Sequence, residues 1–279
     1  MNKTAKIFSA VLAAAAAFNM CSTAFSASAA ESIRILGDLN HDLSVNSCDA
    51  QQALEIYTDS VSGLTDGSVN QDNETADINM DGSITVEDAE SILLYYCQTL
   101  AGKQPLWADF RQVSYENGSS YGSKKEFALR GLYIEVGCAE GAPGTTVTVP
   151  VYVAGLSKLA GFQLGLIHED PMTLTAITSE LNKLECWKTE DTIISNPETG
   201  MLVAAQANDI SLADGFVIGE YTYEIPKNAE SGAHYCITVD QTYTKFVMTD
   251  CVFIDTDPTS TIEKGTYQYT ALSGVVTVI

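Results

Sequence analysis

The apolar and polar residues of this chain follow two different periods, one before residue 100 and another after residue 129. In residues 50–57 and 89–100 the apolar side chains recur at helical spacing, which predicts two amphipathic helices with one apolar stripe each. From Leu129 the period changes to two, over short segments separated by turn-forming residues, which predicts an antiparallel sandwich. The predicted strands lie at 132–136, 145–153, 162–166, 201–205, 219–225, 234–239, 251–254 and 274–279.

An acidic loop of twelve residues stands directly before each predicted helix, at 38–49 and at 77–88. Both loops carry oxygen-bearing side chains at positions 1, 3, 5, 9 and 12, and an aliphatic residue at position 8. Calcium takes six to eight oxygen ligands, and a loop of this length supplies them from those positions and from the main-chain carbonyl at position 7. Because the pattern occurs twice, 39 residues apart, it predicts calcium binding.

The net charge of the chain excludes some classes of binding partner. The formal net charge is −22, and residues 31–100 hold 14 Asp and Glu against one Arg. Nucleic acid and anionic membranes repel such a surface, so neither is expected as a partner, and no segment after residue 30 has the apolar length for membrane insertion. The acids of residues 31–100 gather in the loops, which favours ion binding, whereas those of residues 129–279 are scattered, as on a solvated surface.

Residues 1–30 read as a secretion signal. Lys3 and Lys6 precede an apolar run at 7–20 that is too short to span a bilayer, and small residues at 27–30 offer a cleavage site. A lipoprotein anchor at Cys21 is the alternative, but the residues before it are not small. We therefore expect a secreted, extracellular protein.

The cysteines leave the redox state open. An even number in an exported chain permits disulfides, while buried free thiols are equally compatible with the pattern. Neither CxxC nor a Cys/His cluster occurs, so zinc is not expected. The six cysteines after the signal are Cys48, Cys97, Cys138, Cys186, Cys236 and Cys251.

Residues 101–128 have the composition of a linker, although Trp107 and Phe110 are able to pack back onto a domain. The run Gly118-Ser119-Ser120-Tyr121-Gly122 fits the G-x-S-x-G elbow of hydrolases. That motif needs a buried strand before it and a helix after it, and both flanks here are polar. We expect no enzyme activity.

At this point the residues carry a family resemblance. The duplicated loop with its exiting helix resembles a dockerin, the calcium-dependent plug of cellulosomes. Residues 129–279 resemble a cohesin, the receptor of a dockerin, through 141–151, Asp170-Pro171, 214–219 and 274–278. The resemblance implies a signal peptide at 1–30, a small all-α dockerin at 31–100 with paired EF-hand-like loops, a linker at 101–128, and an all-β jelly-roll cohesin at 129–279.

The resemblance also implies the ligands of two Ca2+ sites, in which the serines contribute their main-chain carbonyls. Position 6 differs between the loops, because Leu43 stands where the second loop has Gly82. A Cβ at a sharp turn of positive φ costs about 1–2 kcal/mol, so we expect the first site to be the weaker or distorted one. The ligands are Asp38, Asn40, Asp42, Ser44, Asn46 and Asp49 in the first loop, and Asp77, Asn79, Asp81, Ser83, Thr85 and Asp88 in the second.

Dockerins face their partner with loop positions 10 and 11, and cohesins bind through one flat face of the sandwich. Because the two dockerin pairs are chemically unlike, we expect one preferred docking orientation, although first-turn helix residues would look the same. The residues implied are Ser47, Cys48, Val86 and Glu87 in the dockerin, and Gln163, Gly165 and Asn208 in the cohesin.

The implied function is a non-catalytic adaptor scaffoldin in polysaccharide degradation, at the cell surface or in a released cellulosome. Its dockerin would bind a cohesin of a larger scaffoldin, and its cohesin would capture a dockerin-bearing enzyme or protein. The alternative is a carbohydrate-binding or carbohydrate-active sandwich carried on a dockerin. A cellulose or glycan site would need a row of exposed aromatic residues, which the strand pattern does not provide.

Overall fold

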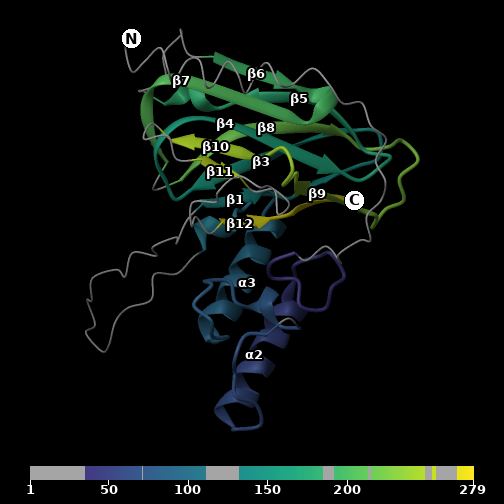
Figure 1. Cartoon of the computed structure of the whole chain (residues 1–279). Helices are drawn as coiled ribbons and strands as arrows, with labels where there is room; N and C mark the ends of the chain where they lie inside the picture. The colour runs from purple at the N-terminus through teal and green to yellow at the C-terminus, as the bar shows by residue number, and fades with distance from the viewer. Residues whose placement is uncertain are drawn as a thin grey trace.

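Figure 1 shows the computed structural model, in which a pair of helices lies against one end of a layered β structure. It describes residues 35–70, 72–110, 132–184, 192–212, 215–248, 253–255 and 269–279. The expected signal at 1–30, most of the expected linker, including residues 118–122, and Cys186 and Cys251 lie outside the described residues. In the described residues, no helix has the length and apolar character needed to span a membrane.

Residues 35–110, called the helical module here, contain two loop–helix repeats. Helix α2 spans Ser47–Val61 and helix α3 spans Val86–Leu100, as the helical spacing predicts. Two short 3₁₀ turns are also present: η2 at Glu74–Ala76 lies between the two helices, and η3 at Trp107–Asp109 follows α3. The helices pack on small side chains, which let two backbones approach closely. The core of the module comprises Leu36, Ala50, Ala53, Ile78, Ala89, Ile92, Tyr95, Trp107 and Phe110.

Trp107 closes this core from the segment after α3. Its ring stacks on Tyr95 with centroids 4.1 Å apart, and Phe110 meets both rings edge-on. Gly37, at φ +83, lies so close to the indole that a Cβ there would clash with it. The aromatic pair at the start of the expected linker is therefore part of the module's core.

The sandwich is formed by short strands that alternate between buried and exposed side chains, because successive residues of a strand face opposite sides of the sheet. Its strands are β1 Leu132–Val136, β2 Ala139–Gly141, β3 Thr146–Ala154, β4 Leu156–His168, β5 Thr173–Ser179, β6 Thr192–Asn196, β7 Met201–Leu212, β8 Phe216–Glu224, β9 His234–Val239, β10 Lys245–Met248, β11 Phe253–Asp255, β12 Tyr269–Leu272 and β13 Gly274–Val278.

These strands form two sheets that face each other across one core. The first sheet has the order β12-β1-β3-β8-β5. The second has the order β11-β10-β4-β9-β13-β2, with β7 beside β4 and β6 beside β7. The core includes Val149, Leu164, Leu202, Tyr221 and Phe246, each almost fully buried.

The expected sandwich is confirmed, but it is not wholly antiparallel. Strands β1 and β12 pair in parallel, and so do β2 and β13. Parallel neighbours need a long crossover, and here the paired strands lie at opposite ends of the sandwich sequence. A pattern of local alternation does not carry that information, so the sequence predicts antiparallel pairs throughout.

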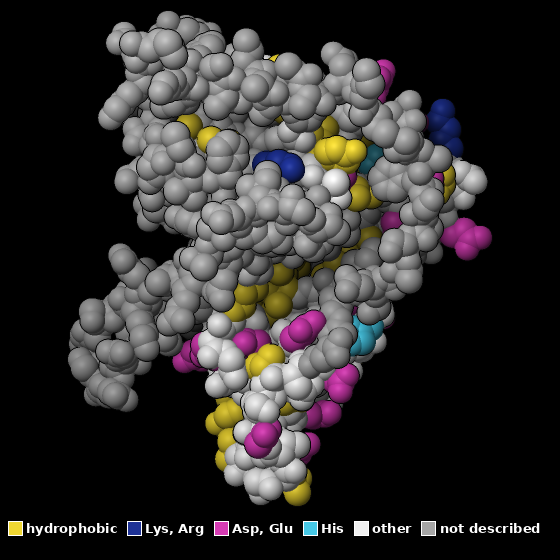
Figure 2. All heavy atoms as spheres, viewed as in Figure 1, with side chains coloured by type: hydrophobic (Ala, Val, Ile, Leu, Met, Phe, Trp, Pro, Cys, Tyr) yellow, Lys and Arg dark blue, Asp and Glu magenta, His cyan; other side chains and the backbone are white. Residues whose placement is uncertain are grey.

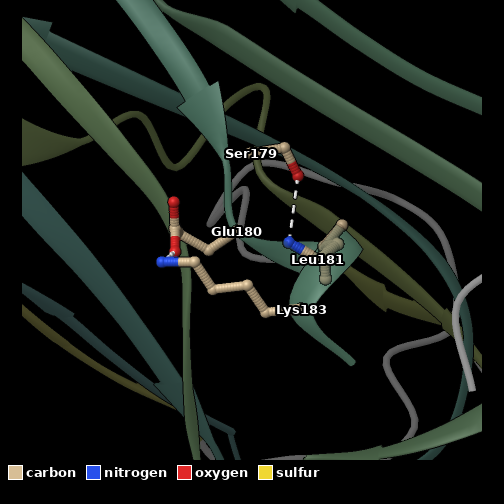
Figure 3. Close-up of polar contacts among 4 residues, drawn as sticks. All are labelled: Ser179, Glu180, Leu181 and Lys183. Carbon is tan, nitrogen blue, oxygen red and sulfur yellow. Dashed lines mark hydrogen bonds and ion pairs between the residues drawn. The ribbon is translucent and has the colours of Figure 1, made fainter. Parts of the chain in front are cut away.

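The end of β5 shows how a strand is terminated at the edge of the first sheet (Figure 3). The hydroxyl of Ser179 accepts the N–H of Leu181 at 3.3 Å, which starts the 3₁₀ turn η4 at Leu181–Lys183. Glu180 and Lys183 form an ion pair beside it. Because the lysine is largely exposed, this pair contributes little to stability.

Candidate functional sites

The first acidic loop is held in shape by its own carboxylates. Asp38, at position 1, accepts the N–H groups of Asp42 at 3.1 Å and Leu43 at 2.8 Å. Asp49, at position 12, accepts the N–H of Asn46 at 2.8 Å. The two ends of the loop therefore draw its middle inward, and the predicted ligands at positions 1, 5, 9 and 12 belong to one network.

The second loop repeats these bonds at the equivalent positions. Asp77 accepts the N–H groups of Asp81 at 3.1 Å and Gly82 at 2.9 Å, and Asp88 accepts the N–H of Thr85 at 2.8 Å. Two different sequences thus adopt one backbone shape, because the shared oxygen side chains at the ligand positions determine it.

Positions 3 and 5 also meet in each loop. The amide nitrogen of Asn40 donates to Asp42 at 3.0 Å, and that of Asn79 donates to Asp81 at 3.1 Å. Ser44 and Ser83, at position 7, each donate their main-chain N–H to the position-5 aspartate at 2.9 Å. Every predicted ligand therefore lies in a loop network with the others of its own repeat.

The last loop residues also start the helices. Asn46 and Thr85, at position 9, are the N-caps of α2 and α3, and the aspartates at position 12 complete a capping box in each helix. Such a cap satisfies main-chain N–H groups that the first helical turn leaves without a partner. A change in the loop is thereby transmitted directly to the helix that follows it.

Charge is concentrated in these loops. Burial raises the pKa of Asp77 to about 6, and the nearby charges of Asp88 and Asp81 add to the shift. Burial likewise raises the pKa of Asp38 and of Asp88. A divalent cation among these oxygens would offset the repulsion, and hard oxygen donors are the ligands that calcium prefers. The residues present therefore fit Ca2+.

No three His, Cys, Asp or Glu side chains in the described ranges are already gathered as a metal cluster. The donor set of these loops is broader, since it includes amide, hydroxyl and main-chain oxygens at positions 3, 7 and 9.

Position 6 has the same backbone in both loops. Leu43 has φ 65 and Gly82 has φ 89, both in the left-handed region. There is open space around a Cβ at Gly82, so only the backbone conformation would oppose a side chain there. Leu43 bears that strain, about 1–2 kcal/mol, and the loop still closes. That the first site is the weaker one stays a prediction.

The predicted docking residues of the loops lie at the start of each helix. Ser47, Cys48, Val86 and Glu87 are all exposed. They are candidate partner contacts from the first turns of α2 and α3.

The apolar stripe predicted for α3 divides between core and surface. Ile92 is fully buried, but Leu93, Leu94 and Leu100 are 45%, 42% and 69% exposed. The stripe prediction is therefore wrong for Leu93 and Leu100, because the helix also buries Tyr95 on its inner side and so turns them outward. Together with Val86 these exposed apolar residues of α3 are called the α3 face here. Figure 2 shows hydrophobic side chains at the surface of the helical end, among acidic and other polar ones.

The equivalent surface of α2 is more polar. Leu54 and Val61, 39 residues before Leu93 and Leu100, are exposed to 42% and 69%. Between them stand Glu55 and Thr58, which are also exposed. The two repeats therefore share a loop but present unlike faces.

The sandwich residues predicted to bind a partner lie on β4 and β7. Phe162, Leu164 and Leu166 point into the core as expected. Gln163 faces the other side but is only 9% exposed. Gly165 is closely bordered by side chains of Met201, Asp240 and Tyr243. The side chain of Asn208, in β7, lies outside the described residues.

The neighbours of β4 offer more accessible surface. On β6, Ile193 packs on the core, so Ile194 points away from it and is 52% exposed. Tyr243, just before β10, is 45% exposed. Sequence reasoning missed both, because the strands β6 and β10 were not predicted. The outward side of β6, β7, β4 and β10 is called the β4 face here.

The chain was compared with protein-family models, curated proteins and solved structures. No protein-family model matches the chain, and no curated protein matches it. Solved structures of cohesins do match. The third cohesin of ScaC from Acetivibrio cellulolyticus, in complex with the ScaB dockerin, has 20% identity, covers 53% of this chain and 99% of its own, and gives a TM-score of 0.38.

Two further matches come from other organisms. The third ScaB cohesin of R. flavefaciens, in complex with a group 1 dockerin, has 16% identity, covers 55% of this chain and 97% of its own, and gives a TM-score of 0.38. A non-cellulosomal cohesin from Archaeoglobus fulgidus has 10% identity, covers 53% and 91%, and gives a TM-score of 0.38. Because these TM-scores and identities are low, the likeness assigns no function by itself.

Proposed function

We propose that this protein is a secreted, non-catalytic adaptor of a cellulosome. Its helical module acts as a dockerin that plugs into a cohesin of a larger scaffold, and its sandwich acts as a cohesin that captures a dockerin-bearing protein. The observation that carries the proposal is the pair of loop–helix repeats with the same hydrogen bonds, set beside a single sandwich.

Calcium has a structural role in this proposal. The residues that would hold it are the carboxylates at positions 1, 5 and 12 of each loop, with the oxygen ligands between them. When bound, the ion supplies positive charge that offsets the carboxylate repulsion. The loop residues themselves then hold the N-caps of α2 and α3, which keeps the docking side chains in place.

The α3 face supports one docking orientation. Two equivalent repeats would allow a partner to bind either helix, but Leu94 and Leu100 are replaced at the equivalent positions of α2 by Glu55 and Val61. Placing Glu55 against an apolar partner surface would cost desolvation free energy. The exposed apolar side chains of α3 are therefore the ones that a partner covers first.

The β4 face is the proposed capture surface of the sandwich. It lies on one side of a β-sheet, and it carries the exposed apolar side chain of Ile194. Tyr243 is the sole large aromatic residue that is highly exposed in the described part of the chain. The described residues form no row of exposed aromatic side chains there, which disfavours the glycan-binding alternative.

The test uses the full exported chain as bait in the secreted proteins of the source organism, with calcium and with chelator. The proposal predicts two captured sets, scaffold proteins with cohesin-like sandwiches and proteins with paired calcium loops, and both sets are lost in chelator. Binding of plant polysaccharide with neither set captured would replace the adaptor function with glycan binding.

A further inference from the structure

Several side chains that point away from the sandwich core are nevertheless buried. On β9, Ile237 and Val239 point into the core, so Cys236 points outward, yet it is 2% exposed. On β13, Val276 and Val278 point inward, and the outward Val275 is also 2% exposed. Because successive residues of a strand face opposite sides of the sheet, the sandwich core does not account for the burial of Cys236 and Val275.

The covering residues come from the first acidic loop. Ile35, just before the loop, forms one apolar cluster with Cys236 and Val275. Leu43 and Val45 from inside the loop pack on this cluster, as does Cys138. In the view of Figure 1 the helical module lies beneath this end of the sandwich. The first loop therefore rests on the sandwich.

A second contact joins the helical module to the sandwich at strand β1. Glu135 points outward from β1 and is 2% exposed. Its carboxylate accepts the main-chain N–H of Trp107 and, at 3.1 Å, that of Ala108, and it also accepts the hydroxyl of Tyr133 at 2.7 Å. A buried carboxylate is tolerated only when such donors replace water, so separating the modules would leave both sides unsatisfied.

Leu43 links this interface to the metal loop. At the same position the second loop has Gly82, which meets open space. Leu43, which departs from the loop pattern, is thus one of the loop residues that pack against the cluster of Ile35, Cys236 and Val275. Its left-handed backbone is supported by an apolar contact that the second loop lacks.

We propose that the sandwich is a support for the first calcium loop, so that calcium binding in that loop and docking of the helical module on the sandwich are coupled. The inference rests on the proposed calcium function. By thermodynamic reciprocity, docking raises the calcium affinity of the first loop by the same factor by which calcium favours docking. Calcium then sets a fixed orientation between the α3 face and the β4 face.

The thiol of Cys236 provides the readout, because it lies under the first loop. Burial raises its pKa to about 12, with Glu169 adding to the shift, which further slows attack by the thiolate. Cys97 is exposed and lies outside both calcium loops, so it serves as the internal reference. The full chain is labelled with a maleimide in calcium and in chelator, and each cysteine is followed by peptide mass spectrometry.

The coupling predicts that chelator speeds labelling of Cys236 by about tenfold or more relative to Cys97, in the usual range of such couplings. In calcium, Leu43→Ala should restore fast labelling of Cys236, since it removes the contact without touching the sandwich. Unchanged labelling of Cys236 in chelator, or full protection in Leu43→Ala, overturns the inference.

Calorimetric titration of the full chain with Ca2+ gives the reciprocal test. Glu135→Gln should weaken binding to the first loop several-fold and leave the second unchanged, while Glu140→Gln, an exposed control on β2, should change neither. Asp42→Ala and Asp81→Ala assign the two binding steps to their loops. Equal affinities in Glu135→Gln and Glu140→Gln contradict the coupling.

Different results would contradict the proposed function and the support role of the sandwich. If the wild-type chain binds no Ca2+, the proposed function itself is wrong. If it binds two ions but neither Cys236 labelling nor the Glu135→Gln titration responds, the support role of the sandwich is wrong and the adaptor function stands.

Discussion

At the scale of single residues, position 6 of the two loops shows how one backbone tolerates two side chains. Gly82 reaches its left-handed conformation without strain, whereas Leu43 reaches it with a Cβ that costs about 1–2 kcal/mol. The first loop compensates with an apolar contact to the sandwich. The same strain introduced in the second loop would have no such contact.

Gly82→Ala should therefore weaken calcium binding to the second loop by about 5- to 30-fold, the equivalent of 1–2 kcal/mol. Calorimetric titration of the full chain measures this change. Gly232→Ala is the matched control, because Gly232 also has positive φ and open space around a Cβ but lies in the sandwich. Equal losses in both variants would show that strain acts on overall stability rather than on the loop.

At the scale of elements, the two helices differ in what they leave exposed. The helical spacing of the apolar residues predicts both helices correctly. It does not determine which part of a broad apolar surface faces the core. In α3 the burial of Tyr95 against Trp107 decides this, and Trp107 lies in a stretch that reads as a linker.

Leu93→Asp should abolish capture of scaffold proteins, because it places a carboxylate in the centre of the α3 face. Leu54→Asp is a closely matched control, since Leu54 occupies the equivalent position of α2 and is exposed to 42%, compared with 45% for Leu93. Pull-down from secreted proteins in calcium measures both. If Leu54→Asp is as damaging as Leu93→Asp, the two repeats are equivalent docking faces and the single orientation is wrong.

The strands that were predicted correctly are those with clear local alternation of apolar and polar residues. Segments with clear alternation, such as β1 and β9, have the predicted bounds. Strands β2 and β12 were missed, because each is short and is held by parallel pairing with a distant segment. The contact of the first loop with β9 and β13 is equally nonlocal, and no spacing in the sequence signals it.

At the scale of the whole molecule, the interface makes the helical module and the sandwich depend on each other. Trp107 contributes to the module's core through its ring and to Glu135 through its main-chain N–H. The α3 face and the β4 face both stay exposed while this interface is closed. In the described residues, the interface between the helical module and the sandwich therefore leaves both proposed docking surfaces uncovered.

Trp107→Ala should destabilise the helical module by about 3–5 kcal/mol, the usual cost of removing a large buried aromatic ring. Calorimetry in calcium should then resolve an early transition of the module, separate from that of the sandwich. Tyr243→Ala, which removes an exposed aromatic ring, should shift neither transition by more than about 0.5 kcal/mol. A single transition unchanged by Trp107→Ala would contradict the role of this ring.

The adaptor function is tested most directly by separating its two docking surfaces in one experiment. Full-length wild type, Leu93→Asp and Ile194→Asp serve as baits in calcium, with Thr178→Asp on the exposed surface of β5 as a control for the sandwich. The adaptor predicts that Leu93→Asp loses only the scaffold proteins, that Ile194→Asp loses only the proteins with paired calcium loops, and that the control keeps both. Loss of both sets in either variant, or of neither in both, would contradict two independent docking surfaces.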